Sequence, residues 1–597
     1  MRLSIHFRDL YAHPNSVASS ELEMMTMMKH IFFSAALLLA ACAASEPEIE
    51  LAREAADITA SSVAQGQLIG FVADNGSHVW RGVPYGADTS GKNRWRAPRP
   101  PAAWDGAREA IKFAPACPQI ATPFTPIASW TNGTLEGSED CLVFDIYAPP
   151  NAKEQAAKGK SLPVMMWIHG GSNVSGASQL YVGENLAKNE NVIVMSVQYR
   201  LGPLGWFSHP DLVASAETPE DASANFGTLD LIAGLKWIQE NAESFGGNPD
   251  NVTIFGESAG GQNVATLLAS PLAEGLFHRA ILQSGGFDST TISDARGETG
   301  ELPNTSDVIT ENLGGSGNFH TATTQEIFDA FELDAGGFME NPRILQDGIV
   351  LPETPLRGLF TSKDNFNAVP IISGVNRDEM KLFYLFNDRL TKTKFGKFIV
   401  AKDQDLYDAA SDYASRVWRI RAVDRPLKMM TAAGHEDVYA YRFDWDEGGK
   451  ILWMDLSKIL GAAHSVEIPF VLNRFKLLGE ADPVMFKDKT LATRNVLSRS
   501  MGTYWANFAR TGQPNGNGLP AWPAYGHQAS VMYLDSTNDG GIRAEAGEDN
   551  FAKIITELKA DPRVDQAEKC EIAQSIIDWV PKLQTELDAL ISCEFAD

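Results

Sequence analysis

The sequence predicts an α/β fold, with a mostly parallel central sheet flanked by helices. Five short runs are nearly continuous in apolar residues, as expected for parallel strands that are buried on both faces. These runs are Val164–Ile168, Val192–Val197, Val252–Phe255, Ala280–Leu282 and Val369–Ile372. Between them, Asp230–Phe245 has apolar residues at helical spacing and ends at a pair of glycines. Apolar strands that alternate with amphipathic helices are typical of a sheet covered on both sides.

A targeting segment precedes the globular part of the chain. Residues 1–26 contain no targeting pattern and run into a cluster of methionines, which indicates a start codon assigned too early. Residues 27–41 pass from a lysine into an apolar run, as a secretory signal does. The run from Ile31 to Ala41 has eleven residues, whereas a helix that spans a bilayer needs ~20. We therefore expect the protein to be exported.

Cys42 directly follows the apolar run. The sequence Leu39-Ala40-Ala41-Cys42 resembles the bacterial lipobox, in which the cysteine is lipidated and becomes the mature N-terminus. An ordinary signal, cut after Ala43 or Ala44, is the alternative and leaves a soluble protein. The expected location is the bacterial cell envelope, as a periplasmic protein or a lipoprotein of the outer membrane tethered through Cys42, or else outside the cell.

The rest of the chain divides into three parts. Residues 42–64 are acidic and poor in aromatic residues, which suits a solvated tether. Residues 65–546 carry the strand and helix patterns of the predicted α/β domain. Within that domain, 287–365 and 380–460 lack the alternation, so we expect them to cap the sheet rather than to extend it. Residues 547–597 are expected to form a helical extension.

The charge balance excludes one broad class of function. The chain holds 76 acidic and 50 basic residues, and its formal net charge is −26. A general nucleic-acid binder needs lysine and arginine to neutralise phosphates, so we expect no nucleic-acid partner.

A candidate nucleophile lies in the sequence Gly256-Glu257-Ser258-Ala259-Gly260. This G-x-S-x-G motif follows the run Val252–Phe255 and opens a helical pattern, which is the strand, turn and helix order of a nucleophile elbow. The context predicts the α/β-hydrolase fold with Ser258 exposed at the end of the sheet. We expect the side chain of Glu257 to point away from the site and to be structural.

A serine needs a base to take its proton, and the base needs an acid to orient it. His464 is the candidate base, because it lies in a loop of small residues and follows the nucleophile in the chain, as the order Ser, acid, His requires. The acid is expected between them, at the end of a strand. Asp378 and Glu379 both occupy such a place, and the pattern alone does not choose between them.

A third element is a set of donors for the developing oxyanion. The segment Ile168-His-Gly-Gly-Ser-Asn173 follows a buried strand, with glycines where backbone N–H groups can approach a substrate oxygen. These N–H groups, together with that of Ala259, are expected to stabilise the tetrahedral intermediate. A plain turn is the alternative interpretation of a Gly-Gly pair after a strand.

Four cysteines remain after Cys42, and export permits disulfides between them. Four cysteines allow three pairings, which spacing alone does not decide. The local pairs Cys117–Cys141 and Cys570–Cys593 close short loops and are preferred, with reduced, buried thiols as the alternative. No CxxC zinc pattern is present. Acyl transfer on a serine implies no metal and no cofactor, so we expect neither.

Several segments, in order along the chain, resemble the type-B carboxylesterase family, which includes the cholinesterases and the bacterial p-nitrobenzyl esterases. The resemblance extends from about Gly66 to Leu534. Its segments are Trp80-Arg-Gly-Val-Pro-Tyr85, Glu139-Asp-Cys-Leu142, Gln198-Tyr-Arg200, Asn225-Phe-Gly-Thr-Leu-Asp230, Phe245-Gly-Gly-Asn-Pro249, Gly256–Gly261, Gln283-Ser-Gly285, Gly374-Val-Asn-Arg-Asp-Glu379 and Trp505-Ala-Asn-Phe508.

The resemblance implies roles for particular residues. It selects Glu379 as the acid, because the triad glutamate of the family ends a similar motif. It implies an oxyanion hole formed by the backbone of Gly171, Ser172 and Ala259, and it supports the pair Cys117–Cys141.

The chain departs from the family pattern at two positions. The family usually has glycine or alanine at the position of Ser172 and an aromatic residue at that of Asn173. A backbone donor survives either change. We hypothesise that Asn173 makes the acyl pocket more polar and favours acids that carry polar substituents.

The resemblance implies a serine carboxylic-ester hydrolase that acts on small to medium esters through an acyl-enzyme. A lipase or amidase on the same triad is the alternative. A non-catalytic, cholinesterase-like binding protein is disfavoured, because all three triad positions are filled. The expected partner is a small-molecule ester, and the sequence predicts no oligomeric state.

Overall fold

The computed structural model describes residues 53–298, 306–331 and 344–579, apart from 123, 124, 126 and 128. The segment 27–41, Cys42 and Cys593 lie outside the described residues, so the signal, the lipidation and the pair Cys570–Cys593 stay predictions. Within the described ranges, no helix has the length and apolar character that a membrane span requires.

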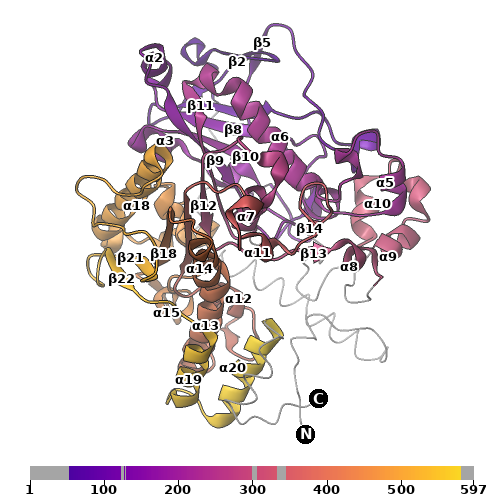
Figure 1. Ribbon diagram of the computed structural model, residues 1–597. Helices are drawn as coiled ribbons and strands as arrows, with labels where there is room; N and C mark the ends of the chain where they lie inside the picture. The colour runs from indigo at the N-terminus through magenta and orange to yellow at the C-terminus, as the bar shows by residue number, and fades with distance from the viewer. Residues whose placement is uncertain are drawn as a thin grey trace.

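An eleven-stranded sheet forms the centre of the protein, in the order β22-β21-β18-β15-β12-β11-β9-β10-β8-β4-β3 (Figure 1). Strands β21 to β10 in this order run parallel, and the strands at both edges are antiparallel to their neighbours. The strands are β3 (Phe71–Val72), β4 (His78–Pro84), β8 (Val143–Ala148), β9 (Leu162–Ile168), β10 (Ile193–Val197), β11 (Gly247–Glu257), β12 (Arg279–Gln283), β15 (Ile371–Asn376), β18 (Val438–Phe443), β21 (Ser530–Leu534) and β22 (Arg543–Ala546). The five predicted apolar runs are β9, β10, β11, β12 and β15, so the predicted α/β-hydrolase sheet is confirmed.

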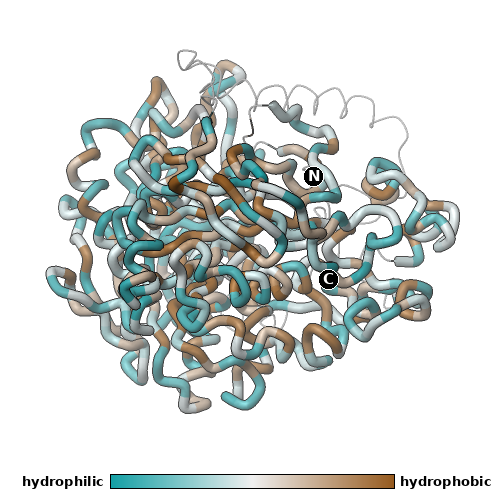
Figure 2. The backbone as a smooth tube through the Cα atoms, turned by 90° about the horizontal axis from the view of Figure 1, so that it is seen from above, coloured by the Kyte–Doolittle hydropathy of each residue, from teal (hydrophilic) through white to brown (hydrophobic). Residues whose placement is uncertain are grey.

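Helices cover both faces of the sheet. Alternate residues of β9 pack into two separate hydrophobic cores, with Met166 and Ile168 on one face and Met165 and Trp167 on the other. The first core contains α7 (Ala259–Ala269), which begins directly after Ser258, and α6 (Phe226–Asn241). The second contains α3 (Glu184–Glu190), α13 (Gln404–Arg419) and α18 (Leu491–Thr511). Figure 2 shows brown, hydrophobic segments through the middle and more teal in the outer loops.

The prediction that 380–460 only caps the sheet is wrong for one segment. Strand β18 lies within this stretch and pairs in parallel with β15 and β21, so it extends the sheet. Its sequence, VYAYRF, contains three aromatic residues and an arginine, and therefore lacks the continuous aliphatic run of a central strand.

Part of the predicted tether at 42–64 belongs to the folded domain instead. Residues Ser61–Val63 form β1, which pairs with β2 (Gly66–Ile69), and η2 (Asp57–Thr59) precedes it. Thr59 is fully buried, and its hydroxyl oxygen accepts a hydrogen bond from the backbone N–H of Gly70 at 2.8 Å. Strand pairing and this buried hydrogen bond fix the segment to the domain.

Two further regions surround the sheet. Between residues 287 and 365, the described residues form α8 (Ile292–Arg296), α9 (Ser306–Asn312) and α10 (Thr324–Asp329), which gather at one side of Figure 1. After Gly547, α19 (Phe551–Ala560) and α20 (Gln566–Trp579) pack beside α13. Tyr413 of α13 donates a hydrogen bond to Asp561 at 2.8 Å, which links the extension to the domain.

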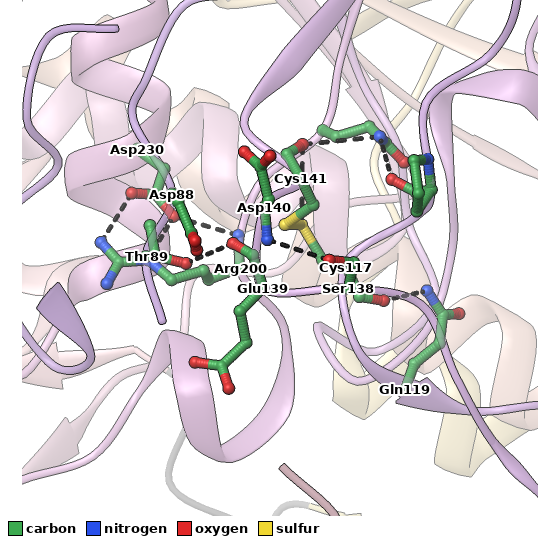
Figure 3. Close-up of a disulfide and its surroundings, with 12 residues drawn as sticks. Asp88, Thr89, Cys117, Gln119, Ser138, Glu139, Asp140, Cys141, Arg200 and Asp230 are labelled. Carbon is green, nitrogen blue, oxygen red and sulfur yellow. Dashed lines mark hydrogen bonds and ion pairs between the residues drawn. A yellow bond between two sulfur atoms is a disulfide. The ribbon is translucent and has the colours of Figure 1, made fainter. Parts of the chain in front are cut away.

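The predicted disulfide between Cys117 and Cys141 is confirmed (Figure 3). Beside it, the fully buried side chain of Gln119 donates to the carbonyls of Cys117 at 3.0 Å and Gly176 at 2.8 Å, and it accepts from the N–H of Gly176 at 2.7 Å. Gly176 in turn packs against Gly170, since a Cβ at Gly176 would lie 2.6 Å from the carbonyl oxygen of Gly170. The disulfide loop thus supports the Gly-Gly segment.

We expect the double variant Cys117→Ser, Cys141→Ser to lose about 3 kcal/mol of unfolding free energy. The disulfide closes the loop between residues 117 and 141 and so restricts the unfolded chain. Guanidinium unfolding followed by tryptophan fluorescence measures the loss. The double variant unfolded with and without reductant is the control, because any further loss on reduction then belongs to the predicted pair Cys570–Cys593. An unchanged midpoint in the double variant would contradict a stabilising role.

Candidate active site

Ser258 lies at a sharp turn between β11 and α7, as the motif predicts. Its backbone has φ 59° and ψ −124°, a conformation that residues other than glycine rarely adopt. Two glycines permit this turn, because a Cβ at Gly256 or Gly260 would lie 2.5 or 2.0 Å from the carbonyl oxygen of Ile168. The end of β9 therefore touches the turn directly. The packing holds Ser258 in its strained conformation at the end of the sheet.

His464 and Glu379 form a buried pair. His464 Nδ1 lies 2.5 Å from Glu379 Oε2, and both side chains are buried. The other oxygen of Glu379 accepts hydrogen bonds from the hydroxyl of Ser284 at 2.6 Å and from the N–H of Asn376 at 2.7 Å. The carboxylate is therefore held from both sides, and it fixes the orientation of the imidazole.

Asp378, the alternative acid, has a different task. Its carboxylate pairs with Arg377 at 2.7 Å and accepts the N–H of Ala462 at 3.0 Å. It thereby fixes the start of the loop that carries His464. The structure thus separates the two acids that the strand pattern left open, and only Glu379 contacts the histidine.

Glu257 contacts the opposite nitrogen of the histidine, so the expectation that it points away is wrong. Its Oε1 lies 3.1 Å from His464 Nε2 and also accepts the hydroxyl of Ser465 at 2.8 Å. Among the described residues, Nε2 makes no well-aligned hydrogen bond. Because Glu257 immediately precedes Ser258, this contact places the imidazole at the nucleophile elbow with Nε2 available.

Three buried carboxylates surround the imidazole and shift the local pKa values. Burial alone lowers the pKa of His464, but the charges of Glu257 and Glu379 outweigh it and raise that pKa. Burial raises the pKa of Glu257, which the charge of His464 partly offsets. Burial and the charge of Glu379 also raise the pKa of Glu467, which accepts hydrogen bonds from Asn376 at 2.5 Å and Gln283 at 3.0 Å.

Two aromatic residues, which the sequence did not single out, lie against the imidazole. The ring centroid of Trp418 is 4.8 Å from that of His464, and that of Phe383 is 5.3 Å away. Trp418 also donates to the carbonyl of Ser284 at 3.3 Å. The Phe383 side chain is 43% exposed, so it is open to solvent beside the site. Ser284 itself lies in the Gln283-Ser-Gly285 segment of the resemblance, the one signal that could have marked it.

The Gly-Gly segment turns back on itself beside the nucleophile. Gly171, Ser172 and Asn173 all have positive φ, of 101°, 56° and 58°. A Cβ at Gly170 would lie 2.6 Å from the carbonyl oxygen of Glu257, so the segment approaches the elbow closely. Within the described part of the chain, the N–H groups of Gly171 and Ser172 make no hydrogen bond. The N–H of Ala259, at the start of α7, has no partner within its helix.

Asn173 is fully buried and joins this segment to α7. Its Oδ1 accepts a hydrogen bond from Asn263 Nδ2 at 2.8 Å. The Tyr199 hydroxyl lies 3.4 Å from this oxygen and donates to the carbonyl of His169 at 2.6 Å. The Nδ2 of Asn173 has no partner among the described residues. The side-chain amide of Asn173 therefore fixes the position of the Gly-Gly segment, and its Nδ2 remains available as a donor. The described residues contain no cluster of His, Cys, Asp and Glu side chains suited to a metal ion.

The comparisons with known proteins agree with this geometry. A sequence model of the carboxylesterase family matches residues 57–431 and 400–552. Para-nitrobenzyl esterase of Bacillus subtilis (strain 168) is 33% identical over 486 residues, which cover 78% of this chain and 92% of that protein. Cocaine esterase of Homo sapiens is 32% identical over 515 residues, which cover 79% and 86%.

Solved structures show the same relationship in space. A structure of a PNB esterase superposes with a TM-score of 0.65 and 28% identity, over 83% of this chain and 99% of that one. Carboxylesterase EST55 of Geobacillus stearothermophilus superposes with a TM-score of 0.63 and 30% identity, again over 83% and 99%. The similarity thus covers the sheet, the elbow and the residues around it, and the chain belongs to the carboxylesterase family.

Proposed function

We propose that the protein hydrolyses small to medium carboxylic esters through an acyl-enzyme formed on Ser258. The observation that carries this proposal is the continuous set of contacts from Glu379 through His464 to the nucleophile elbow. It gives a nucleophile, a base with one nitrogen available, and an acid that orients the base, which is the constellation that acyl transfer requires.

In the first step, Ser258 Oγ attacks the ester carbonyl and His464 Nε2 accepts the serine proton. Glu379 orients the imidazole and stabilises the imidazolium that forms. The imidazolium then gives its proton to the leaving alcohol. In the second step, His464 activates a water molecule, which releases the acid and restores the serine.

The oxyanion of each tetrahedral intermediate needs preorganised donors. The N–H groups of Gly171, Ser172 and Ala259 are the donors available beside the elbow. They are held in place by the close contacts of Gly170 and by the hydrogen bond between Asn173 and Asn263. Each such donor contributes about 3 kcal/mol to transition-state stabilisation in related chemistry.

Ser258→Ala should lower kcat for p-nitrophenyl acetate and butyrate by at least ~10³-fold, because the variant keeps the oxyanion donors but cannot form an acyl-enzyme. Steady-state hydrolysis by purified protein measures this. Ser500→Ala, on the outer face of α18, is the matched control and should retain wild-type rates. Retention of most activity by Ser258→Ala would exclude Ser258 as the nucleophile.

The pH dependence of the reaction should report the carboxylates around His464. The base must be neutral to accept a proton, so kcat/KM rises as pH increases through the pKa of His464. Glu257 raises this pKa, because its negative charge favours the imidazolium. Removing that charge therefore lowers the pKa and extends the neutral base to lower pH.

In Glu257→Gln, we expect the acid limb of the kcat/KM profile to move down by about 1 to 3 pH units, the effect typical of one close opposite charge. Profiles of p-nitrophenyl butyrate hydrolysis between pH 5 and 10 measure the midpoint, because the charges around His464 raise its pKa to about 9. Glu190→Gln, a half-buried acid that accepts from Thr503, is the control and should leave the midpoint unchanged. A midpoint in Glu257→Gln that stays fixed or moves up would contradict the assigned charge effect.

The acyl group that the enzyme prefers is proposed from Asn173. Its Oδ1 accepts from Asn263, whereas its Nδ2 has no partner among the described residues and can donate a hydrogen bond to a substrate. A hydroxyl or carboxylate on the acyl chain supplies an acceptor for this donor, whereas a plain alkyl chain does not. An unmet buried donor costs free energy, which favours polar acyl groups.

Wild type should therefore have a higher kcat/KM for the p-nitrophenyl ester of 3-hydroxybutyrate than for that of butyrate. Asn173→Leu should reduce this ratio about fivefold or more, which corresponds to the loss of one hydrogen bond. Thermal unfolding of both proteins controls for misfolding. Equal or faster turnover of plain butyrate by wild type would contradict the proposal.

A further inference from the structure

Two β-hairpins carry exposed apolar side chains at their tips. Phe395 is 76% exposed, and Leu452 and Trp453 are 63% and 50% exposed. These three residues are here called the hairpin patch. The strands that hold them are β16 (Thr391–Lys394) with β17 (Phe398–Ala401), and β19 (Lys450–Ile451) with β20 (Met454–Asp455).

The two tips form one surface although about 55 residues separate them in sequence. The rings of Phe395 and Trp453 lie 4.8 Å apart between centroids. Phe398, which is buried, contacts Trp453 from below at 5.7 Å. The patch is therefore built on an anchored aromatic base and is not a set of isolated exposed residues.

The turns themselves would favour other residues at these positions. Phe395 and Leu452 have φ values of 53° and 50°, a region in which glycine and asparagine carry little strain and bulky side chains carry about 1 kcal/mol or more. Most of each side chain is exposed, so burial offsets little of this strain. Turn formation therefore does not explain why Phe395 and Leu452 occupy these positions, whereas contact with an apolar surface outside the protein does.

The charge around the first hairpin differs from that of the whole chain. Residues 389–402 contain five basic residues and no acidic one, in a protein of net charge −26. Lys392, Lys394 and Lys397 flank Phe395 in sequence. Within the described part of the chain, none of these three lysines lies within 4.0 Å of a carboxylate. Their charges are available to an anionic partner.

We propose that the hairpin patch docks on an anionic lipid surface. The apolar tips enter the boundary between headgroups and acyl chains, and the three lysines meet the lipid phosphates. Aromatic residues beside lysines are suited to this boundary, because the rings are amphipathic and the long lysine side chains reach back to the charged layer.

Size and shape favour a lipid surface over a protein partner. Three side chains at two protruding turns cover far less than the ~800 Å² per partner of a stable protein interface. A lipid surface needs only a few apolar side chains together with charge attraction, and each lysine near an anionic surface contributes about 1 kcal/mol. The patch supplies both.

The test is flotation of the full chain with vesicles of phosphatidylglycerol and phosphatidylcholine, and with vesicles of phosphatidylcholine alone, at low salt. Wild type should bind the anionic vesicles. The triple variant Phe395→Asn, Leu452→Asn, Trp453→Gly should bind at least about tenfold more weakly while the turns keep favourable residues. Lys392→Gln, Lys394→Gln, Lys397→Gln should weaken binding by a similar factor.

Two control variants separate the patch from general effects. Ile58→Asn removes an exposed apolar side chain elsewhere, and the pair Lys158→Gln, Lys160→Gln removes exposed charge elsewhere. Both should bind as wild type, and all variants should hydrolyse soluble p-nitrophenyl acetate at the wild-type rate.

Three outcomes would overturn the proposal. The first is that wild type does not bind anionic vesicles. The second is equal binding by all variants, which would place the binding surface outside the hairpin patch and its three lysines. The third is that the patch variants change the sedimentation coefficient of the lipid-free protein, because the patch would then be an interface between copies of the chain.

Discussion

The close contact between the end of β9 and the turn at Ser258 is the constraint on which the site depends. Gly256 and Gly260 both approach the carbonyl oxygen of Ile168 more closely than any Cβ allows. This contact exists only because β9 and β11 are adjacent parallel strands whose carboxyl ends meet at one edge. The same edge delivers the Gly-Gly segment from β9 and Glu379 from just beyond β15. The sheet thus sets the spacing between the proposed nucleophile, oxyanion donors and acid.

A second constraint is the number of carboxyl groups buried around one imidazole. Glu257, Glu379 and Glu467 are all fully or almost fully buried, and each has at least one side-chain or backbone donor besides the histidine. Burying carboxylates without such donors would cost several kcal/mol each. The network therefore favours the imidazolium that forms during acyl transfer. The same network keeps the base protonated, and so unable to accept a proton, at low pH.

The sequence predicted the parts of this arrangement that local pattern determines. The apolar runs identified the inner strands, and the motif identified Ser258, because both depend on neighbours in sequence. The pattern could not separate Asp378 from Glu379, since both follow the same strand and only the fold shows which one reaches His464. For the same reason, the side chain of Glu257 was wrongly expected to point away from the site. Trp418 and Phe383 come from segments without a recognisable pattern, and β18 was missed because its tyrosines replace the aliphatic run of a buried strand.

Residues with a strained, positive φ occur both at the catalytic centre and in the hairpin patch. Among the described residues other than glycine, five with positive φ lie at the centre or beside it: Ser172, Asn173, Ser258, Ser284 and Ser465. Asparagine tolerates this conformation, and Trp95, a bulky example elsewhere, is fully buried and donates to Pro203 at 2.7 Å. Strain of this kind persists where surrounding contacts hold it or where function requires it. Phe395 and Leu452 are bulky and largely exposed, so the proposed contact with a lipid surface would account for their presence at these strained positions.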